Sequence, residues 1–137
     1  MKIYNGIDIC SINRISKALE VFGEKFINRI FTLKEKLEAK NKDGTYNINY
    51  LAKRFAGKEA FSKAIEEGIG SIAFKDISIV RGENGVPVLS LSSKAVSYLL
   101  NNKNWLEYNI SVSLSDEDGI NGGIAIASVI ILVNKNK

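Results

Sequence analysis

The sequence predicts an α+β fold in which a mostly antiparallel sheet packs against one long central helix. A segment rich in isoleucine opens the chain, helical spacing of apolar residues dominates the first half, and alternating apolar segments fill the second half. Segregated helices and strands of this kind are typical of an antiparallel sheet with helices on one face. At 137 residues, the chain is expected to form a single domain over 1–137.

Four helices are expected in the first half, because apolar residues recur there every three or four positions. Their predicted ranges are 12–23, 24–31, 33–42 and 49–67. Ser11 is an N-cap for the first, and Thr32 with Glu35 forms a capping box for the third, a polar helix that we expect on the surface. Gly68 is the expected stop of the long central helix.

The sheet is expected to contain one N-terminal strand and four later strands. Their predicted ranges are 2–10, 74–82, 86–91, 105–115 and 120–133. Glycine-containing turns at 82–85 and 116–119 predict two antiparallel hairpins. A serine caps a short helix expected at 94–102, and residues 135–137 are expected to form a frayed tail.

The absence of histidine excludes several catalytic designs. A Ser-His-Asp triad, a Cys-His pair and a histidine-bearing zinc site all need an imidazole. Cys10 is the single cysteine, so a thiolate zinc site and an internal disulfide are excluded too, and we interpret it as a small buried residue. Any metal ion must therefore be a hard cation held by carboxylate oxygens, such as Mg²⁺, Mn²⁺ or Ca²⁺.

The single thiol and the hydropathy pattern indicate the cellular compartment in which we expect the protein. Asp8 interrupts the first ten residues, which therefore do not resemble a signal peptide, and a lone cysteine fits a reducing cytoplasm. The longest apolar run, from Ile124 to Val133, is shorter than the roughly 18 residues needed to span a bilayer. We expect a cytoplasmic protein with no membrane partner.

The formal net charge of +4 suits an anionic partner. Basic residues recur near helical spacing in the first two helices; they are Arg14, Lys17, Lys25 and Arg29. Such a stripe is usually a solvated face, although it equally suits an acidic helix of a partner protein. Nucleic acid is not the expected partner, because aromatic residues are not interleaved with the basic ones.

Three places are candidate sites. Asp8 follows Ile7 near the end of the first strand, where the chain turns into a helix, a common position for a ligand and also for an ordinary helix-start acid. Glu59 and Lys63 lie four residues apart in the central helix, a spacing that by itself predicts an ion pair worth about 0.2–0.5 kcal/mol. The glycine turns at 68–70 and 82–85 either present backbone N–H groups to a phosphate or simply form turns.

These segments together resemble one family over nearly the whole chain. The motifs are GIDI at 6–9, FTLKE at 31–35, RFAGKEAFSKAI at 54–65, GIG at 68–70, GVPVL at 85–89, VSLS at 112–115 and AIASVI at 125–130. GIDI with an F-A-x-K-E-A-x-x-K-A helix at this separation is specific, whereas each part alone is weak. The chain resembles the holo-[acyl-carrier-protein] synthases, the small trimeric phosphopantetheinyl transferases.

The resemblance implies an Mg²⁺-dependent transferase of fatty acid biosynthesis. Such enzymes move 4′-phosphopantetheine from coenzyme A to a serine of apo acyl carrier protein and release adenosine 3′,5′-bisphosphate. The family's metal-binding residues map onto Asp8 and Glu59, and Glu59 is also the best candidate for the general base. The family's helix lysine maps onto Lys63, which is expected to stabilise charge on the transferring phosphate.

The resemblance also implies where the substrates bind. The active sites of the family lie between subunits of a homotrimer, so one chain is expected to supply part of each site. The expected cofactor-binding residues are Gly68, Gly70, Gly85, Pro87 and Ser113. The expected docking residues for the acidic carrier protein are Arg14, Lys17 and Lys25.

One position departs from the family pattern. The family usually reads S-L-S-H where this chain has Ser113-Leu114-Ser115-Asp116. An acid beside a polyanionic cofactor should weaken binding unless it faces away or meets the metal. The departure leaves open a catalytically weak module that binds coenzyme A or the carrier protein, and the net charge leaves open a small RNA-binding domain.

Overall fold

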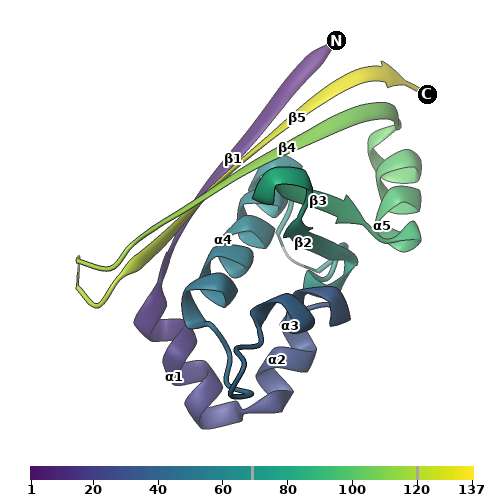
Figure 1. The fold of residues 1–137 in the computed structure, drawn as a ribbon. Coiled ribbons are helices and arrows are strands. Elements are labelled where there is room, and N and C mark those ends of the chain that lie inside the picture. The colour runs from purple at the N-terminus through teal and green to yellow at the C-terminus, as the bar shows by residue number, and fades with distance from the viewer. Residues whose placement is uncertain (69, 120) are drawn as a thin grey trace.

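A long antiparallel sheet organises the chain in a computed structural model, which describes residues 1–68, 70–119 and 121–137 (Figure 1). The sheet has the strand order β1-β5-β4 within these residues. Its strands are β1 (Lys2–Ser11), β5 (Ile124–Asn136) and β4 (Trp105–Glu117). Helix α4 (Ile48–Ala64) lies across one face, which confirms the predicted α+β arrangement of an antiparallel sheet and a long central helix.

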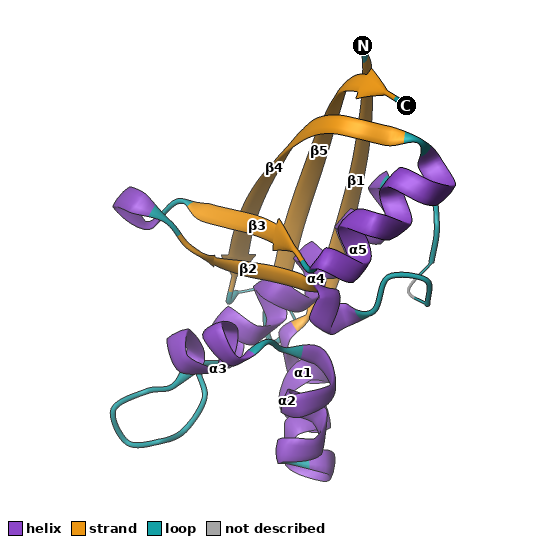
Figure 2. Ribbon diagram, turned by 90° about the vertical axis from the view of Figure 1, so that its right-hand side faces the viewer, coloured by secondary structure: helices purple, strands orange, loops and turns teal. Residues whose placement is uncertain are grey.

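A two-stranded hairpin lies beside α4, as the sequence predicted (Figure 2). Its parts are β2 (Ile77–Arg81), the turn η2 (Glu83–Gly85) and β3 (Pro87–Leu91). The first residues of the predicted strand, Phe74–Asp76, instead form a 3₁₀ turn, η1. The Asp76 carboxylate accepts the Ala73 N–H at 2.9 Å, and the Asp76 carbonyl oxygen accepts the Ser92 N–H at 2.8 Å. These bonds close a turn before strand pairing begins.

The remaining helical segments are short. They are α1 (Ile12–Phe22), α2 (Glu24–Ile30), α3 (Leu33–Ala39), α5 (Ser93–Tyr98) and the π-helical segment η3 (Leu99–Lys103). The predicted caps are confirmed, since Ser11 Oγ accepts the Arg14 N–H at 3.3 Å and Thr32 forms a capping box with Glu35. Among the described residues, no helix combines the length and the apolar character needed to cross a membrane.

The end of α4 differs from the prediction. The helix ends at Ala64, and Glu66 adopts a left-handed conformation with a φ of 64°. The Glu67 N–H bonds back to the Ser62 carbonyl oxygen at 3.1 Å, as is usual where a helix ends in a left-handed residue. Glu66, and not Gly68, therefore terminates the helix.

Helix α3 lies at the surface as its sequence predicted, with Leu33, Lys34 and Leu37 exposed, but Glu35 is fully buried on its inner face. Its carboxylate lies 2.7 Å from the equally buried Lys58 Nζ, which also donates to the Ile30 and Phe74 carbonyl oxygens at 2.7 and 3.1 Å. The second Glu35 oxygen accepts the Ile79 N–H at 2.8 Å. Full pairing of this kind is what makes a buried charge tolerable. The network ties α2, α3, η1 and β2 to α4.

Close packing joins β1 to α4. Gly6 lies so near the helix that a Cβ at this position would overlap the Ala60 carbonyl oxygen. Glycine allows a backbone to approach in this way because it has no side chain. The contact brings the C-terminal half of β1, including Asp8, against the side chains of α4.

The C-terminal residues belong to the sheet, which contradicts the predicted frayed tail. Strand β5 continues to Asn136, and the Lys137 N–H donates to the Asn104 carbonyl oxygen at 2.7 Å. Nearby, Trp105 is buried against Tyr4, with ring centroids 4.8 Å apart. Aromatic packing therefore anchors this end of the sheet.

Candidate active site

Asp8, Glu59 and Lys63 meet where β1 packs on α4. Asp8 lies two residues from the buried Cys10 along the strand, so its side chain faces the helix. Lys63 Nζ lies 3.0 Å from Asp8 Oδ1 and donates to the Ile7 carbonyl oxygen at 3.0 Å. Lys63 therefore bridges helix and strand, and among the described residues it does not form the ion pair with Glu59 that their spacing alone predicted.

Glu59 is half-buried, and its surroundings disfavour its charged form. Burial raises the pKa of Glu59, and the negative charge of Asp8 raises it further, while Arg14 and Lys63 act in the opposite direction. A carboxylate whose pKa is perturbed by burial and a like charge, and which lines a cleft, is typical of a functional site.

Asp8 and Glu59 fit a hard divalent cation. Mg²⁺ is commonly held by one or two carboxylates, with phosphate oxygens and water as its other ligands. The described ranges contain no cluster of three or more metal-ligating side chains, so the arrangement matches this type and not an all-protein cage. Burial raises the pKa of Cys10 to about 11, so its thiol stays protonated and is not a competing ligand.

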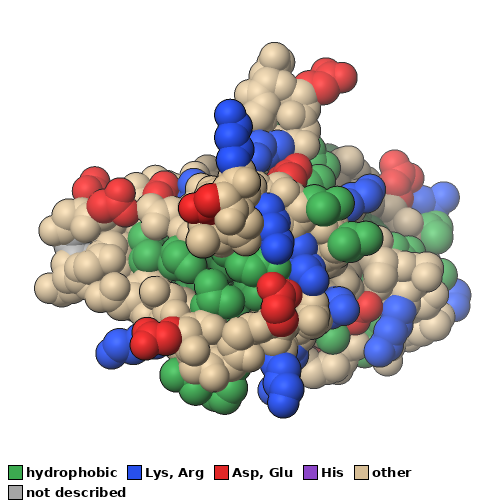
Figure 3. All heavy atoms as spheres, turned by 60° about the horizontal axis from the view of Figure 1, so that its bottom comes forward, with side chains coloured by type: hydrophobic (Ala, Val, Ile, Leu, Met, Phe, Trp, Pro, Cys, Tyr) green, Lys and Arg blue, Asp and Glu red, His purple; other side chains and the backbone are tan. Residues whose placement is uncertain are grey.

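A groove of about 530 Å³ lies beside Glu59, between α1, α2 and α4. Its lining is mostly apolar and includes Phe26 and Phe55, and Phe55 stacks on Phe74 with ring centroids 5.5 Å apart. Its basic lining residues are Arg14, Lys25 and Arg29. Figure 3 brings this end of the molecule forward and shows hydrophobic side chains gathered in a hollow, with Lys and Arg beside them. We call this cavity the apolar groove.

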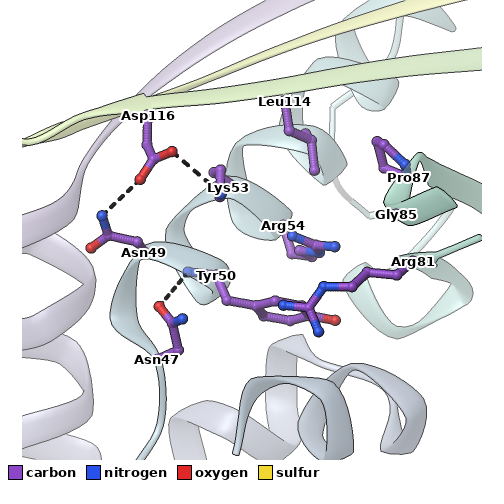
Figure 4. A pocket seen from close by; sticks show the side chains of 10 residues that line it. All are labelled: Asn47, Asn49, Tyr50, Lys53, Arg54, Arg81, Gly85, Pro87, Leu114 and Asp116. Atoms are coloured by element: carbon purple, nitrogen blue, oxygen red, sulfur yellow. Dashed lines mark hydrogen bonds and ion pairs between the residues drawn. The ribbon is translucent and has the colours of Figure 1, made fainter. Parts of the chain in front are cut away.

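A second cavity, the basic pocket, lies between α4, β4 and the β2–β3 hairpin and has a volume of about 400 Å³ (Figure 4). Its charged lining residues are Lys53, Arg54, Arg81 and Asp116. Gly85 and Pro87, two of the predicted cofactor-binding residues, also line it. Among the described residues, its lining shares no member with that of the apolar groove, because the two cavities lie on opposite flanks of α4.

Arg54 is held rigidly at the basic pocket. It is only 5% exposed, its Nε donates to the Ile79 carbonyl oxygen at 3.1 Å, and its guanidinium lies 3.7 Å from the centre of the Tyr50 ring. The Tyr50 hydroxyl donates to Glu38 at 2.7 Å. Arg81 stacks on Tyr50 as well, at 5.3 Å, so two guanidinium groups share one aromatic ring. Such preorganised guanidinium groups suit a phosphate.

Asp116 faces this pocket from the end of β4. Its carboxylate accepts a hydrogen bond from Asn49 at 2.7 Å and lies 3.3 Å from Lys53 Nζ. The hydrogen bond from Asn49, together with Lys53, lowers the pKa of Asp116. The residue that departs from the family pattern thus stays ionised at neutral pH and is paired with a pocket cation.

Other predicted site residues lie apart from both cavities. Ser113 faces the exposed side of the sheet, because it alternates along β4 with Leu114, which lines the basic pocket. Gly68 and Gly70 border open space beyond the end of α4. Lys17 is exposed on α1 but does not line the groove.

Few features of the sequence indicated the basic pocket. Arg54 offered one signal, because it lies four residues from both Tyr50 and Lys58 on a helix that is otherwise rich in small apolar residues. A charge in such a position is rarely buried without a partner. Lys53 and Arg81 offered none, since only the packing of the hairpin on α4 brings them together.

The fold and the two sites define a class of protein, an α+β enzyme whose paired carboxylates and fixed cations suit the transfer of a phosphate-linked group. The family model described as the 4′-phosphopantetheinyl transferase superfamily matches residues 5–115. The chain belongs to this family.

Curated relatives and solved structures agree. The holo-[acyl-carrier-protein] synthase of Wolbachia sp. subsp. Drosophila simulans is 42% identical over 129 residues, which cover 93% of this chain and 96% of the relative. The crystal structure of the synthase from Neisseria meningitidis has a TM-score of 0.78 and 35% identity, covering 94% of this chain and 97% of that one. The Helicobacter pylori synthase in complex with coenzyme A has a TM-score of 0.75 and 34% identity, covering 93% and 99%. These similarities confirm the resemblance that the motifs indicated.

Proposed function

We propose that this chain transfers 4′-phosphopantetheine from coenzyme A to a serine of an acyl carrier protein, for fatty acid biosynthesis in the cytoplasm. Family membership and the similarity to a synthase in complex with coenzyme A support this reaction. The observation that carries it is the meeting of Asp8, Glu59 and Lys63 at the contact between β1 and α4. Residues 1–137 act as one transferase domain in this proposal.

The reaction needs a base and a stabiliser of phosphate charge. The carrier serine oxygen forms a bond to the phosphorus nearest the pantetheine, and the bond from that phosphorus to the nucleotide breaks. The serine proton passes to Glu59, whose raised pKa brings it closer to the range of an effective base. Lys63 stabilises the negative charge on the transferring phosphate, and adenosine 3′,5′-bisphosphate leaves.

Asp8 and Glu59 would hold Mg²⁺, which supplies charge neutralisation and orientation for the pyrophosphate of coenzyme A. The two carboxylates repel each other in the metal-free protein, and Lys63 offsets part of that charge through Asp8. With Mg²⁺ bound, Asp8 would no longer depend on Lys63 for charge compensation, and the Lys63 ammonium would be available to the phosphate.

We assign the nucleotide end of coenzyme A to the basic pocket. Coenzyme A has one phosphate outside its pyrophosphate, on the 3′ position of the ribose, and it needs cationic partners. Lys53, Arg54 and Arg81 line the pocket and suit that phosphate. Gly85 and Pro87 offer a wall on which the adenosine can lie close to the backbone.

One coenzyme A molecule must reach both groups of residues, yet α4 separates Asp8 and Glu59 from the basic pocket within one chain. We therefore propose a homotrimer in which each site combines the carboxylates of one subunit with the basic pocket of the next. The outer face of β1 supports this assembly, because Ile3, Ile7 and Ile9 are 67%, 59% and 63% exposed on it. An apolar face of this kind is typical of a subunit interface.

The apolar groove suits the carrier protein. Its aromatic lining offers contact to the apolar side of an amphipathic helix, and Arg14 and Lys25 offer positive charge to the acidic side. Glu59 also lines the groove, so a carrier docked there would present its serine to the base. Lys17 lies on the same helix as Arg14, α1, and would steer the encounter without lining the groove.

Intact-protein mass spectrometry tests the proposal. Apo acyl carrier protein incubated with this chain, coenzyme A and Mg²⁺ should gain one phosphopantetheine, and EDTA should prevent the gain. A folded chain that binds coenzyme A but yields no adduct would instead be a binding module, the alternative that Asp116 in the basic pocket favours. If coenzyme A with Mg²⁺ fails to raise the melting temperature, both functions are wrong.

A further inference from the structure

Lys53 is the cation of the basic pocket that is paired with an acid lining the same pocket. The guanidinium of Arg54 is fixed by the Ile79 carbonyl oxygen and by Tyr50, and Arg81 lies against the same ring. Lys53 has a flexible side chain that is 26% exposed, and its ion-pair partner is Asp116, at 3.3 Å. The charge that Lys53 offers to a ligand therefore depends on one acid.

Asp116 is itself held in place. Asn49 donates to Asp116 Oδ2 at 2.7 Å and to Asp118 Oδ1 at 2.8 Å, so its amide fixes the Asp116 carboxylate at the pocket. Asp116 is partly exposed and lines the pocket, whereas Asp118 does not. An anion entering the pocket meets a carboxylate that has already paired with one of the three cations.

We propose that Asp116 is a specificity-determining residue that weakens the hold on the 3′-phosphate of the nucleotide by keeping Lys53 paired. This inference rests on the proposed assignment of coenzyme A to the basic pocket. The phosphate competes with Asp116 for the Lys53 ammonium and is repelled by the carboxylate. The same 3′-phosphate is present in the product, adenosine 3′,5′-bisphosphate, so Asp116 speeds product release as well as lowering substrate affinity.

Calorimetry with two ligands isolates this effect. In the presence of Mg²⁺, Asp116→Asn should bind coenzyme A about fivefold more tightly than the unaltered chain does, since one nearby negative charge is removed. Binding of 3′-dephospho-coenzyme A, which lacks the phosphate in question, should not change. Asparagine keeps the shape of the side chain and can still accept the bond from Asn49, and Asp116→Ser provides a second variant without the charge.

Asp118→Asn is the matched control. It removes one negative charge just past the end of the same strand and alters the other hydrogen bond that Asn49 donates, but the position lies outside the pocket lining. Its affinity for both ligands should equal that of the unaltered chain. Equal gains in Asp116→Asn and Asp118→Asn would mean that net charge alone matters, and would overturn the proposal.

The role of Lys53 is tested by repeating the measurement in a Lys53→Met background. The gain in coenzyme A affinity from Asp116→Asn should shrink there, because no ammonium remains to be released. In a separate assay, adenosine 3′,5′-bisphosphate should inhibit the Asp116→Asn enzyme more strongly than the unaltered enzyme. An undiminished gain, or an unchanged ratio between the two coenzyme A affinities, would overturn the inference and leave the transferase function standing. Binding of neither ligand by the unaltered chain would overturn the proposed function itself.

Discussion

Burial and the neighbouring Asp8 raise the pKa of Glu59, so the folded, metal-free chain holds a proton at this residue more tightly than the unfolded chain does. A group of this kind contributes stability below its unfolded pKa, about 4.3 for Glu, and that contribution is lost as the pH rises through the folded pKa. Ionised Glu59 therefore lowers the stability of the metal-free protein at neutral pH. A residue that destabilises the empty site is typical of a site built for a cation.

Glu59→Gln should raise the melting temperature of the metal-free protein at pH 8, because the amide carries no charge to bury. The difference should shrink towards pH 4, where Glu59 becomes protonated, and the rise that Mg²⁺ produces should be lost. Thermal unfolding in EDTA and in Mg²⁺ across this pH range measures both effects. The exposed Glu20→Gln on α1 serves as the control, and a variant at Glu59 that melts below the unaltered protein at pH 8 would contradict the argument.

Asp8→Ala and Glu59→Ala should each abolish formation of holo acyl carrier protein without unfolding the chain. Both side chains are partly exposed and point into the site, so their loss creates no large core cavity. Mass spectrometry of the carrier and circular dichroism of the variant measure the two outcomes. Asp43→Ala, in an exposed loop, is the matched control. Turnover at the unaltered rate in either site variant would rule out the metal assignment.

At the scale of elements, the buried ion pair of Lys58 and Glu35 holds the helices and the hairpin in register around α4. Lys58 Nζ has three acceptors, and two of them, the carbonyl oxygens of Ile30 and Phe74, belong to residues that line the apolar groove. The pair therefore fixes the walls of a cavity that it does not itself line.

Lys58→Met should lower the free energy of unfolding by about 3–5 kcal/mol, because it leaves the Glu35 carboxylate buried without its cation. The double variant Lys58→Met with Glu35→Gln should recover part of that loss, since the neutral amide can be buried at lower cost. Urea unfolding curves measure the difference. A double variant less stable than Lys58→Met would show that Glu35 is not the source of the penalty.

Local patterns explain which elements were predictable. The capping box of Thr32 and Glu35 was predicted because both residues lie within one helical turn. The burial of Glu35 was not, because its partner Lys58 is 23 residues away along the chain. A glycine was predicted to end α4, because glycine adopts the left-handed conformation most easily. Glu66 adopts this conformation instead, because the surrounding fold holds it.

The candidate site, too, was predictable from the sequence only in part. Asp8, Glu59 and Lys63 were found from motifs that resemble a family, and the packing of β1 on α4 brings them together. The basic pocket was found only in part, through Gly85 and Pro87, because its cations come from α4 and β2 and are joined by tertiary packing. Residues of a site that are scattered in this way leave no periodic pattern in a single sequence.

At the scale of the whole molecule, α4 separates the carboxylates Asp8 and Glu59 from the basic pocket of the same chain. This separation predicts complementation between subunits. Asp8→Ala and Arg54→Met should each be inactive alone, because one lacks a carboxylate and the other a fixed cation. Co-expressed, they should recover activity, since some sites in a mixed trimer combine an intact carboxylate pair with an intact basic pocket. Native mass spectrometry confirms mixing, and mixed trimers without recovered activity would contradict a site shared between subunits.

Docking of the carrier protein also belongs to the scale of the whole molecule, because it depends on basic residues at the surface. Lys25→Glu should raise the KM for the carrier protein several-fold more than the KM for coenzyme A, because Lys25 lines the apolar groove and not the basic pocket. Arg14→Glu should act in the same direction, and both effects should weaken as salt is added. Steady-state kinetics with each substrate varied in turn measure the split. Equal losses for both substrates would argue against docking in the groove.

Trp105 is an intrinsic fluorescent probe of unfolding in this protein. It is the single tryptophan of the chain, and it is buried between Tyr4 and Tyr108 at the end of the sheet where β4 begins. Trp105 pairs with Asn136 and Asp8 with Ala127, so nine residues of β5, roughly 30 Å, separate it from the carboxylates. Its fluorescence should shift to longer wavelength when the sheet unfolds and stay constant when a ligand occupies the site of its own chain. The same untagged sample thus reports unfolding through its emission and ligand binding through calorimetry, and the two signals do not mix.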